Sequence, residues 1–211
     1  MHGIQIYDEI GRLKRVLVHK PGPETHNYAE GDFEQVFSLR KWSRRFDYDQ
    51  ALSEYEHLVA LFEHEGVEVL TVQQLLTEAL DANPQARVEL TEDYSLECGA
   101  RGQELLYAIL AKLENEKTNR AFAQAVIEGI HYGETQLPNA QVGSLAAHMH
   151  EAFNENALLV NPLNTLFFTR DPATPIGRGA LLNHLYWPER NREVSVYRCI
   201  LRYHPLFPIH R

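Results

Sequence analysis

The sequence contains 211 residues, enough for one domain with a sizeable hydrophobic core. Hydrophobic residues make up 44% and charged residues 23% of it, which excludes a largely disordered chain, a collagen-like chain and a membrane bundle. With 20 Lys and Arg against 29 Asp and Glu, the net charge is −9, and so acidic a chain repels phosphate backbones. The densest basic run, residues 40–45, is short and is followed by aspartates, so we expect no nucleic-acid partner.

The sequence also carries no membrane or export signal. No window approaches the roughly 18–20 apolar residues that span a membrane, and the N-terminus lacks the basic and apolar runs of a signal peptide. The two cysteines, Cys98 and Cys199, are too few for a disulfide scaffold and form no CxxC motif. These features predict a cytoplasmic protein with free thiols and no membrane contact.

Residues 1–72 have the order of an α/β module. Residues 12–19 end in an apolar, β-branched run, which indicates a strand. Apolar residues then recur at helical spacing, at Leu52, Tyr55, Val59 and Phe62. Gly66 stands where a helix C-terminal glycine belongs, and the alternating run 67–72 predicts a second strand. Strand, helix and strand together indicate an α/β fold.

Residues 73–150 are rich in helix signals and predict a helical insertion. Residues 103–110 carry no strand signal, and Thr118 is placed to cap a helix over 119–128 that ends at Gly129. Eleven histidines are scattered along the chain, but His148 with His150, and His57 with His64, fit no zinc motif, so we expect no metal site.

Residues 151–211 return to an α/β pattern and form the predicted second module. We expect strands over 157–160, 165–169 and 179–186. A helix face follows at Val194, Tyr197 and Leu201, closed by Pro205. Sequences such as GxGxxG, GxxxxGK[ST] and GxSxG are absent, so nucleotide binding and serine hydrolysis lack support.

One stretch suggests chemistry. In the stretch 164–172 an apolar run ends in Thr-Arg-Asp and breaks at Pro172, which places Asp171 at the carboxyl end of a predicted strand, where α/β folds gather ligands. A carboxylate there can accept paired N–H bonds from a guanidinium, and Phe168 could flank an aliphatic stem. The residues alone favour the alternative that Asp171 only shapes an Asp-Pro turn.

Several ordered motifs resemble the bacterial arginine deiminases. They are Tyr7–Gly22, Glu65–Leu70, Phe168–Pro172, Ile176–Gly179, Leu182–Glu193 and Tyr203–Pro205. The resemblance covers both ends of the chain strongly and the helical middle weakly. It implies a pentein-like fold, here a partial pseudo-fivefold α/β propeller with a helical insertion. It also implies hydrolysis of L-arginine to L-citrulline and ammonia through a cysteine adduct, with a histidine as acid and base and no cofactor.

The resemblance assigns roles to four residues. Asp171 matches the catalytic aspartate that binds the guanidinium, and Phe168 matches the aromatic residue on the substrate's methylenes. Arg190 matches an arginine that clamps the α-carboxylate. Asn164 resembles a substrate-binding asparagine, but one extra residue separates it from Asp171, which reverses the side-chain direction along a strand and leaves its role open.

The family's nucleophile is missing from the pattern. Cys98 falls in the predicted insertion and Cys199 in a predicted helix, and neither has an activating neighbour. We therefore expect an N-terminal half of an arginine deiminase that is inactive alone, with exposed apolar flanks at 165–168 and on the 194–201 helix that cause self-association. The alternatives are a non-catalytic binding module, or one half of a split deiminase whose C-terminal half is a separate partner.

Overall fold

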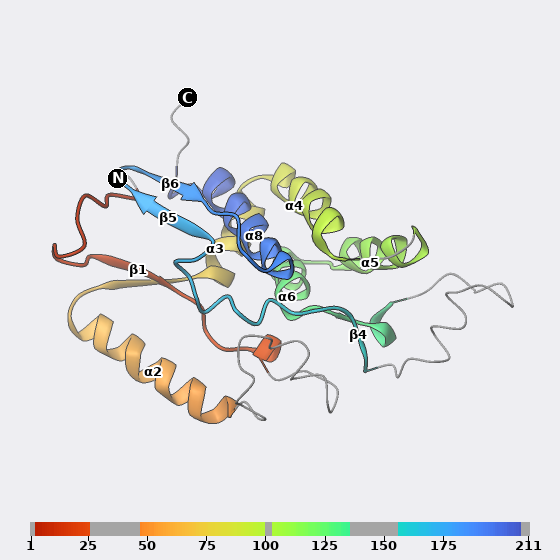
Figure 1. The fold of residues 1–211 in the computed structure, drawn as a ribbon, viewed down its shortest axis with the longest axis horizontal. Helices are drawn as coiled ribbons and strands as arrows, with labels where there is room; N and C mark the ends of the chain where they lie inside the picture. The colour runs from red at the N-terminus through yellow and green to blue at the C-terminus, as the bar shows by residue number, and fades with distance from the viewer. Residues whose placement is uncertain (1–2, 26–46, 100–102, 136–155, 208–211) are drawn as a thin grey trace, which may run out of the picture. The chain divides into compact units, whose positions relative to one another are not determined.

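The computed structural model describes residues 3–25, 47–99, 103–135 and 156–207 (Figure 1). They fall into two compact units, each discontinuous in sequence. Unit 1 takes residues 1–21, 47–93 and 165–211, and unit 2 takes residues 22–46 and 94–164. The mixed α/β class is confirmed. Strands of the described ranges pair only in twos and close no barrel, so the propeller and the division at residues 72 and 150 stay predictions.

Unit 1 begins with the predicted strand–helix–strand order. Strand β1 (Arg15–Val18) pairs in parallel with β2 (Glu68–Thr71), and helix α2 (Tyr48–His64) connects them. The Asp47 carboxylate caps α2 by accepting the Gln50 N–H at 3.0 Å. Gly66, with φ 72°, ends the helix in the left-handed conformation that glycine adopts without strain. These predictions are confirmed.

Two helices form the centre of unit 1. Helix α3 (Val72–Ala82) packs on α8 (Asn191–Tyr203), and buried residues of both make the core: Leu75, Leu76, Leu80, Val196 and Ile200. Helix α4 (Pro84–Glu97) begins in this unit, where the Arg198 guanidinium of α8 lies 2.6 Å from the Asp93 carboxylate. The predicted helix face at Val194 and Tyr197 is confirmed as a buried face.

The predicted strand over 165–169 is wrong. The Phe168 N–H donates to the Thr165 carbonyl at 3.0 Å, and the Asp171 N–H donates to the Phe168 carbonyl at 3.1 Å, so the segment makes successive turns. Thr165 and Leu166 are both buried, whereas Phe167 and Phe168 are both exposed. A strand would alternate its side chains between two faces, which this in-in-out-out pattern does not allow.

A β-hairpin follows, of which the sequence predicted only the second strand. Strand β5 (Ala173–Ile176) pairs antiparallel with β6 (Gly179–Leu182), and the turn holds Gly177 at φ 59° (Figure 1). Pro175 removes a backbone donor and masks β5 in the sequence. The predicted strand 179–186 is shorter than expected, and the 3-10 helix η3 (Pro188–Arg190) leads into α8.

Unit 2 contains the predicted cap and helix. Helix α5 (Gln103–Asn115) is followed by α6 (Asn119–Glu128), where the Thr118 hydroxyl accepts the Ala121 N–H at 3.1 Å. Gly129 ends α6 at φ 80°, as predicted. The short strand β3 (Ile130–His131) was not predicted. It pairs antiparallel with β4 (Leu158–Val160), which was predicted. Two 3-10 helices, η1 (Pro23–Thr25) and η2 (Tyr132–Glu134), complete the unit's described elements.

The predicted exposed flank is wrong for most of its members. Leu166, Val194 and Tyr197 are 0%, 6% and 3% exposed, and of the 165–168 segment only the two phenylalanines face solvent. The basic run 40–45 and the pair His148 and His150 lie outside the described residues. Among the helices that the structure describes, none has the length and apolar character needed to cross a membrane.

Candidate functional site

Arg190 stands at the junction of η3 and α8 and is held by a carboxylate one turn later. Its Nε donates to Glu193 Oε1 and its Nη2 donates to Glu193 Oε2, both at 2.9 Å. Pro188 pre-forms the first turn, and the spacing of three residues places both side chains on one face of the helix start. The planar guanidinium and the carboxylate therefore meet as a two-bond fork.

Asp171 meets the same guanidinium from the turn before β5. Arg190 Nη1 donates to Asp171 Oδ2 at 2.9 Å. The Asn183 amide donates to the Asp171 carbonyl at 2.8 Å and to the Thr174 hydroxyl at 2.9 Å, which fixes the backbone that carries the carboxylate. The Asp171 side chain is 45% exposed, against 12% for Arg190, so Asp171 forms the open side of the site.

Phe168 provides the aromatic surface. Its ring centroid lies 5.6 Å from Arg190 Cζ, within the range of a cation–π contact. Phe167 packs against it, with ring centroids 4.2 Å apart. We call Phe168, Asp171, Arg190 and Glu193 the Arg190 cluster.

The charges of the Arg190 cluster favour a cationic ligand. Burial opposes the charged form of Arg190, but the hydrogen bonds and charges of Glu193 and Asp171 outweigh it and raise the pKa of the guanidinium. One cation between two carboxylates leaves one negative charge over. Because Asp171 is the exposed carboxylate, this charge is presented to a ligand at Asp171.

The structure brings together three of the four residues predicted from the sequence: Phe168, Asp171 and Arg190. The fourth, Asn164, is buried and belongs to unit 2. Asp171 does not follow a strand, so the strand-end argument for it was wrong; it lies in a bend, as the turn alternative expected, and also pairs with Arg190. Glu193 was missed, although an acidic residue three positions after Arg190 at a helix start was a usable signal.

Neither cysteine has the setting of a nucleophile. Cys199 is 5% exposed, and burial, aided by the charges of Glu89 and Asp93, raises the pKa of its thiol to about 12. The Cys98 thiol is also buried and donates to the Ser95 carbonyl at 3.5 Å. Since the thiolate is the reactive form of a cysteine, the raised pKa disfavours reaction at Cys199.

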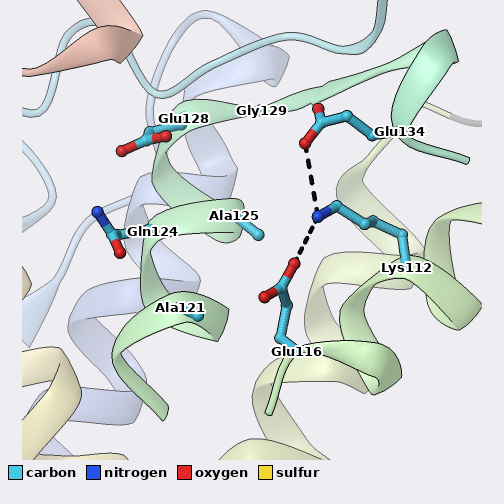
Figure 2. A pocket seen from close by; sticks show the side chains of 8 residues that line it. All are labelled: Lys112, Glu116, Ala121, Gln124, Ala125, Glu128, Gly129 and Glu134. Atoms are coloured by element: carbon cyan, nitrogen blue, oxygen red, sulfur yellow. Dashed lines mark hydrogen bonds and ion pairs between the residues drawn. The ribbon is translucent and has the colours of Figure 1, made fainter. Parts of the chain in front are cut away.

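Unit 2 holds a separate acidic cavity of about 250 Å³ (Figure 2). Lys112 Nζ lies 2.5 Å from Glu116 Oε1 and 3.5 Å from Glu134 Oε1. Burial, with the charges of Glu24 and Glu134, raises the pKa of Glu128 on its wall. No residue of the Arg190 cluster lines this cavity, and the described residues contain no group of three side chains suited to a metal ion.

Comparison with known proteins identifies similar sequences. The family model for arginine deiminase matches residues 42–211. The arginine deiminases of Streptococcus sanguinis (strain SK36) and Streptococcus gordonii (strain Challis) are each 31% identical to the chain, over 98% of it and 48% of their own length. That of Streptococcus pneumoniae (strain P1031) matches with the same identity and coverage. The chain thus spans about half the length of the curated relatives it matches.

Proposed function

Because this chain belongs to the arginine deiminase family, we propose that its Arg190 cluster binds L-arginine for hydrolysis to L-citrulline and ammonia. The observation that carries the proposal is the contact of Arg190 with Asp171 beside the Phe168 ring. Phe168 and Asp171 lie in one short segment and Arg190 lies 19 residues after Asp171, and the resemblance to the family assigns each of them a role at the substrate. Together they form one half of the proposed substrate site.

The guanidinium of the substrate pairs with Asp171. Oδ2 of Asp171 accepts from Arg190, whereas Oδ1 accepts no bond from the other described side chains and belongs to a carboxylate that is 45% exposed. A guanidinium can donate to Oδ1 while its methylenes lie on the Phe168 ring, which is 40% exposed. Pairing fixes the cation and prepares its carbon for attack by a nucleophile.

The α-carboxylate of the substrate pairs with Arg190. Three of the five N–H groups of a guanidinium are used by Glu193 and Asp171, so two remain for a ligand. The excess negative charge of the cluster disfavours a simple anion. A zwitterion with a cationic side chain satisfies both ends, which makes arginine a better ligand than a carboxylate alone.

The chemical step requires a thiolate that neither cysteine supplies. In the family mechanism, a thiolate bonds to the guanidinium carbon, the C–N bond breaks and ammonia leaves with a proton from a histidine. Water then attacks the same carbon and releases citrulline and the thiol. Cys98 and Cys199 are buried, so we propose that the isolated 211-residue chain binds arginine without turning it over.

Calorimetric titration with three ligands tests this function. L-Arginine carries both charged ends, L-citrulline lacks the guanidinium charge, and agmatine lacks the carboxylate. We expect arginine to bind at least about 10-fold more tightly than either, because each lost charge-assisted pair costs about 1.5–3 kcal/mol. Asp171→Asn should remove the preference for arginine over citrulline. Equal binding of arginine and citrulline by the wild-type chain would contradict the proposal.

The buried cysteines favour a second candidate, a binding module of the same family without catalysis. The two candidates differ in what happens when the chain is combined with the part of a streptococcal deiminase that it does not match. A split deiminase should form citrulline when the chain is mixed with the remaining half of a streptococcal arginine deiminase, whereas a binding module should not. Asp171→Asn in the mixture is the control, because it should abolish citrulline formation in the split enzyme.

A further inference from the structure

Glu193 is an almost completely buried carboxylate that accepts hydrogen bonds from Arg190 and from Thr165. Its side chain is 1% exposed. It accepts two bonds from Arg190 and a third from the Thr165 hydroxyl. A buried charge is costly unless it is paired and hydrogen-bonded, and these three donors satisfy that requirement.

We propose that Glu193 is the positioning residue of the arginine site, which holds the Arg190 guanidinium plane in the one orientation that serves Asp171 and a ligand. The fork fixes Nε and Nη2, so that Nη1 reaches Asp171 Oδ2 and two N–H groups remain. The identity of the ligand rests on the proposed function, whereas the positioning rests on the contacts alone.

Glu193 also links the two segments that carry the site. Thr165 stands three residues before Phe168, in the turns that lead to Asp171, and is 5% exposed. By accepting the Thr165 hydroxyl, the carboxylate ties these turns to α8. The Asp171 backbone has its own anchor in the Asn183 amide, so Glu193 governs chiefly the orientation of Arg190.

Two neighbouring residues of the same segment provide matched controls. Glu189, in η3, is exposed and carries the same charge one residue before Arg190. Tyr197, one helical turn after Glu193, is buried, and its hydroxyl has no hydrogen-bond partner among the described residues. Glu189→Gln removes a nearby charge and Tyr197→Phe removes a buried polar group, but neither residue donates a hydrogen bond to the fork.

The first arm of the test uses the ligand-free, 15N-labelled full chain. The Arg190 Nε–H signal, assigned by its loss in Arg190→Lys, should exchange slowly with water because it is bonded to a buried acceptor. We expect exchange at least about 10-fold faster in Glu193→Gln, since a charge-assisted bond is replaced by a weaker one. Glu189→Gln and Tyr197→Phe should leave it unchanged. An unchanged signal in Glu193→Gln would overturn the proposal.

The second arm separates positioning from general loss of structure. Glu193→Gln should weaken L-arginine binding about 10-fold or more but agmatine binding less than about 2-fold, because only arginine has a carboxylate for Arg190. Equal weakening of both ligands would overturn the positioning role. If Glu193→Gln does not fold, Thr165→Val, with Thr165→Ser as its rescue, should give the same split. A wild-type chain that binds neither ligand would refute the proposed function, and the exchange arm would still decide the positioning role.

Discussion

His204 Nε2 lies 2.7 Å from Glu78 Oε2, and this contact joins the end of α8 to α3. The other ring nitrogen, Nδ1, accepts the Leu206 N–H at 3.0 Å. An acceptor nitrogen carries no proton, so the proton of the neutral ring must be on Nε2, where it is donated to Glu78. The two contacts together fix one tautomer of a side chain that is 8% exposed.

We predict that His204 is held as the Nε2–H tautomer and that its loss loosens the end of α8. Long-range 1H–15N correlation spectra at neutral pH should show an unprotonated Nδ1. His204→Phe keeps a ring but leaves the Leu206 N–H without its acceptor, which should cost about 1 kcal/mol of unfolding free energy in urea titrations. A protonated Nδ1 at neutral pH would contradict the assignment.

Glu78 should make the stability of unit 1 depend on pH in the acid range. Hydrogen bonds from Gln74 and then from His204 lower the pKa of this carboxyl, against the opposing effect of burial. A lowered pKa in the folded state gives stability that is present above the unfolded pKa and lost as pH falls through the folded pKa. Because the Glu78 side chain is 47% exposed, solvent screening keeps the effect small.

The variant Glu78→Gln should therefore lose less stability than the wild type between about pH 5 and pH 3, where ordinary Glu side chains titrate. Urea unfolding at several pH values measures this difference. Glu54→Gln is the matched control, because Glu54 accepts the same amide bond from Gln50, four residues earlier, and makes no hydrogen bond or ion pair with a histidine among the described residues. An identical loss of unfolding free energy between pH 5 and pH 3 in the wild type and Glu78→Gln would refute the prediction.

The sequence predicted what local patterns determine. Strands β1 and β2 have apolar runs bounded by turn residues, and the caps at Thr118 and Gly66 depend only on neighbouring backbone. The run 165–169 misled because three consecutive apolar residues between threonines are compatible with a strand until their burial is known. Pro175 had the opposite effect: a proline argues against a strand, so β5 was not predicted.

The candidate site was predictable only where its residues form local sequence patterns. Phe168, Asp171 and Arg190 stand in ordered motifs, so the family pattern indicated them. The bond between Thr165 and Glu193 joins residues 28 positions apart and depends on how a turn packs on α8. No spacing rule encodes that contact, so the tie between Glu193 and Thr165 became visible only with the structure.

Gly129 should tolerate no side chain. Its φ is 80° and its ψ is −174°, a region that essentially only glycine occupies. A Cβ on this residue would meet the Val160 carbonyl oxygen at 2.5 Å. We expect Gly129→Ala to destabilise the chain by about 2 kcal/mol or more, because strain and a backbone clash add. Gly66→Ala is the control: φ is 72° but nothing lies within 4 Å, so it should cost about 1 kcal/mol in the same urea titrations. Equal costs would contradict the clash.

The cysteines should behave as packing residues in every assay. The Cys199 pKa of about 12 leaves almost no thiolate near neutral pH, and its Sγ lies 3.9 Å from the Ala86 carbonyl oxygen inside unit 1. An aromatic disulfide reagent should therefore label the native chain at pH 7 far more slowly than the urea-unfolded chain, at both Cys98 and Cys199. Cys199→Ala should destabilise the chain by about 1 kcal/mol through lost packing. Neither Cys199→Ala nor Cys98→Ser should change the dissociation constant for arginine. Fast labelling of Cys199 in the native chain, or citrulline formation that either substitution abolishes, would assign that cysteine a chemical role and refute the binding-only account of the isolated chain.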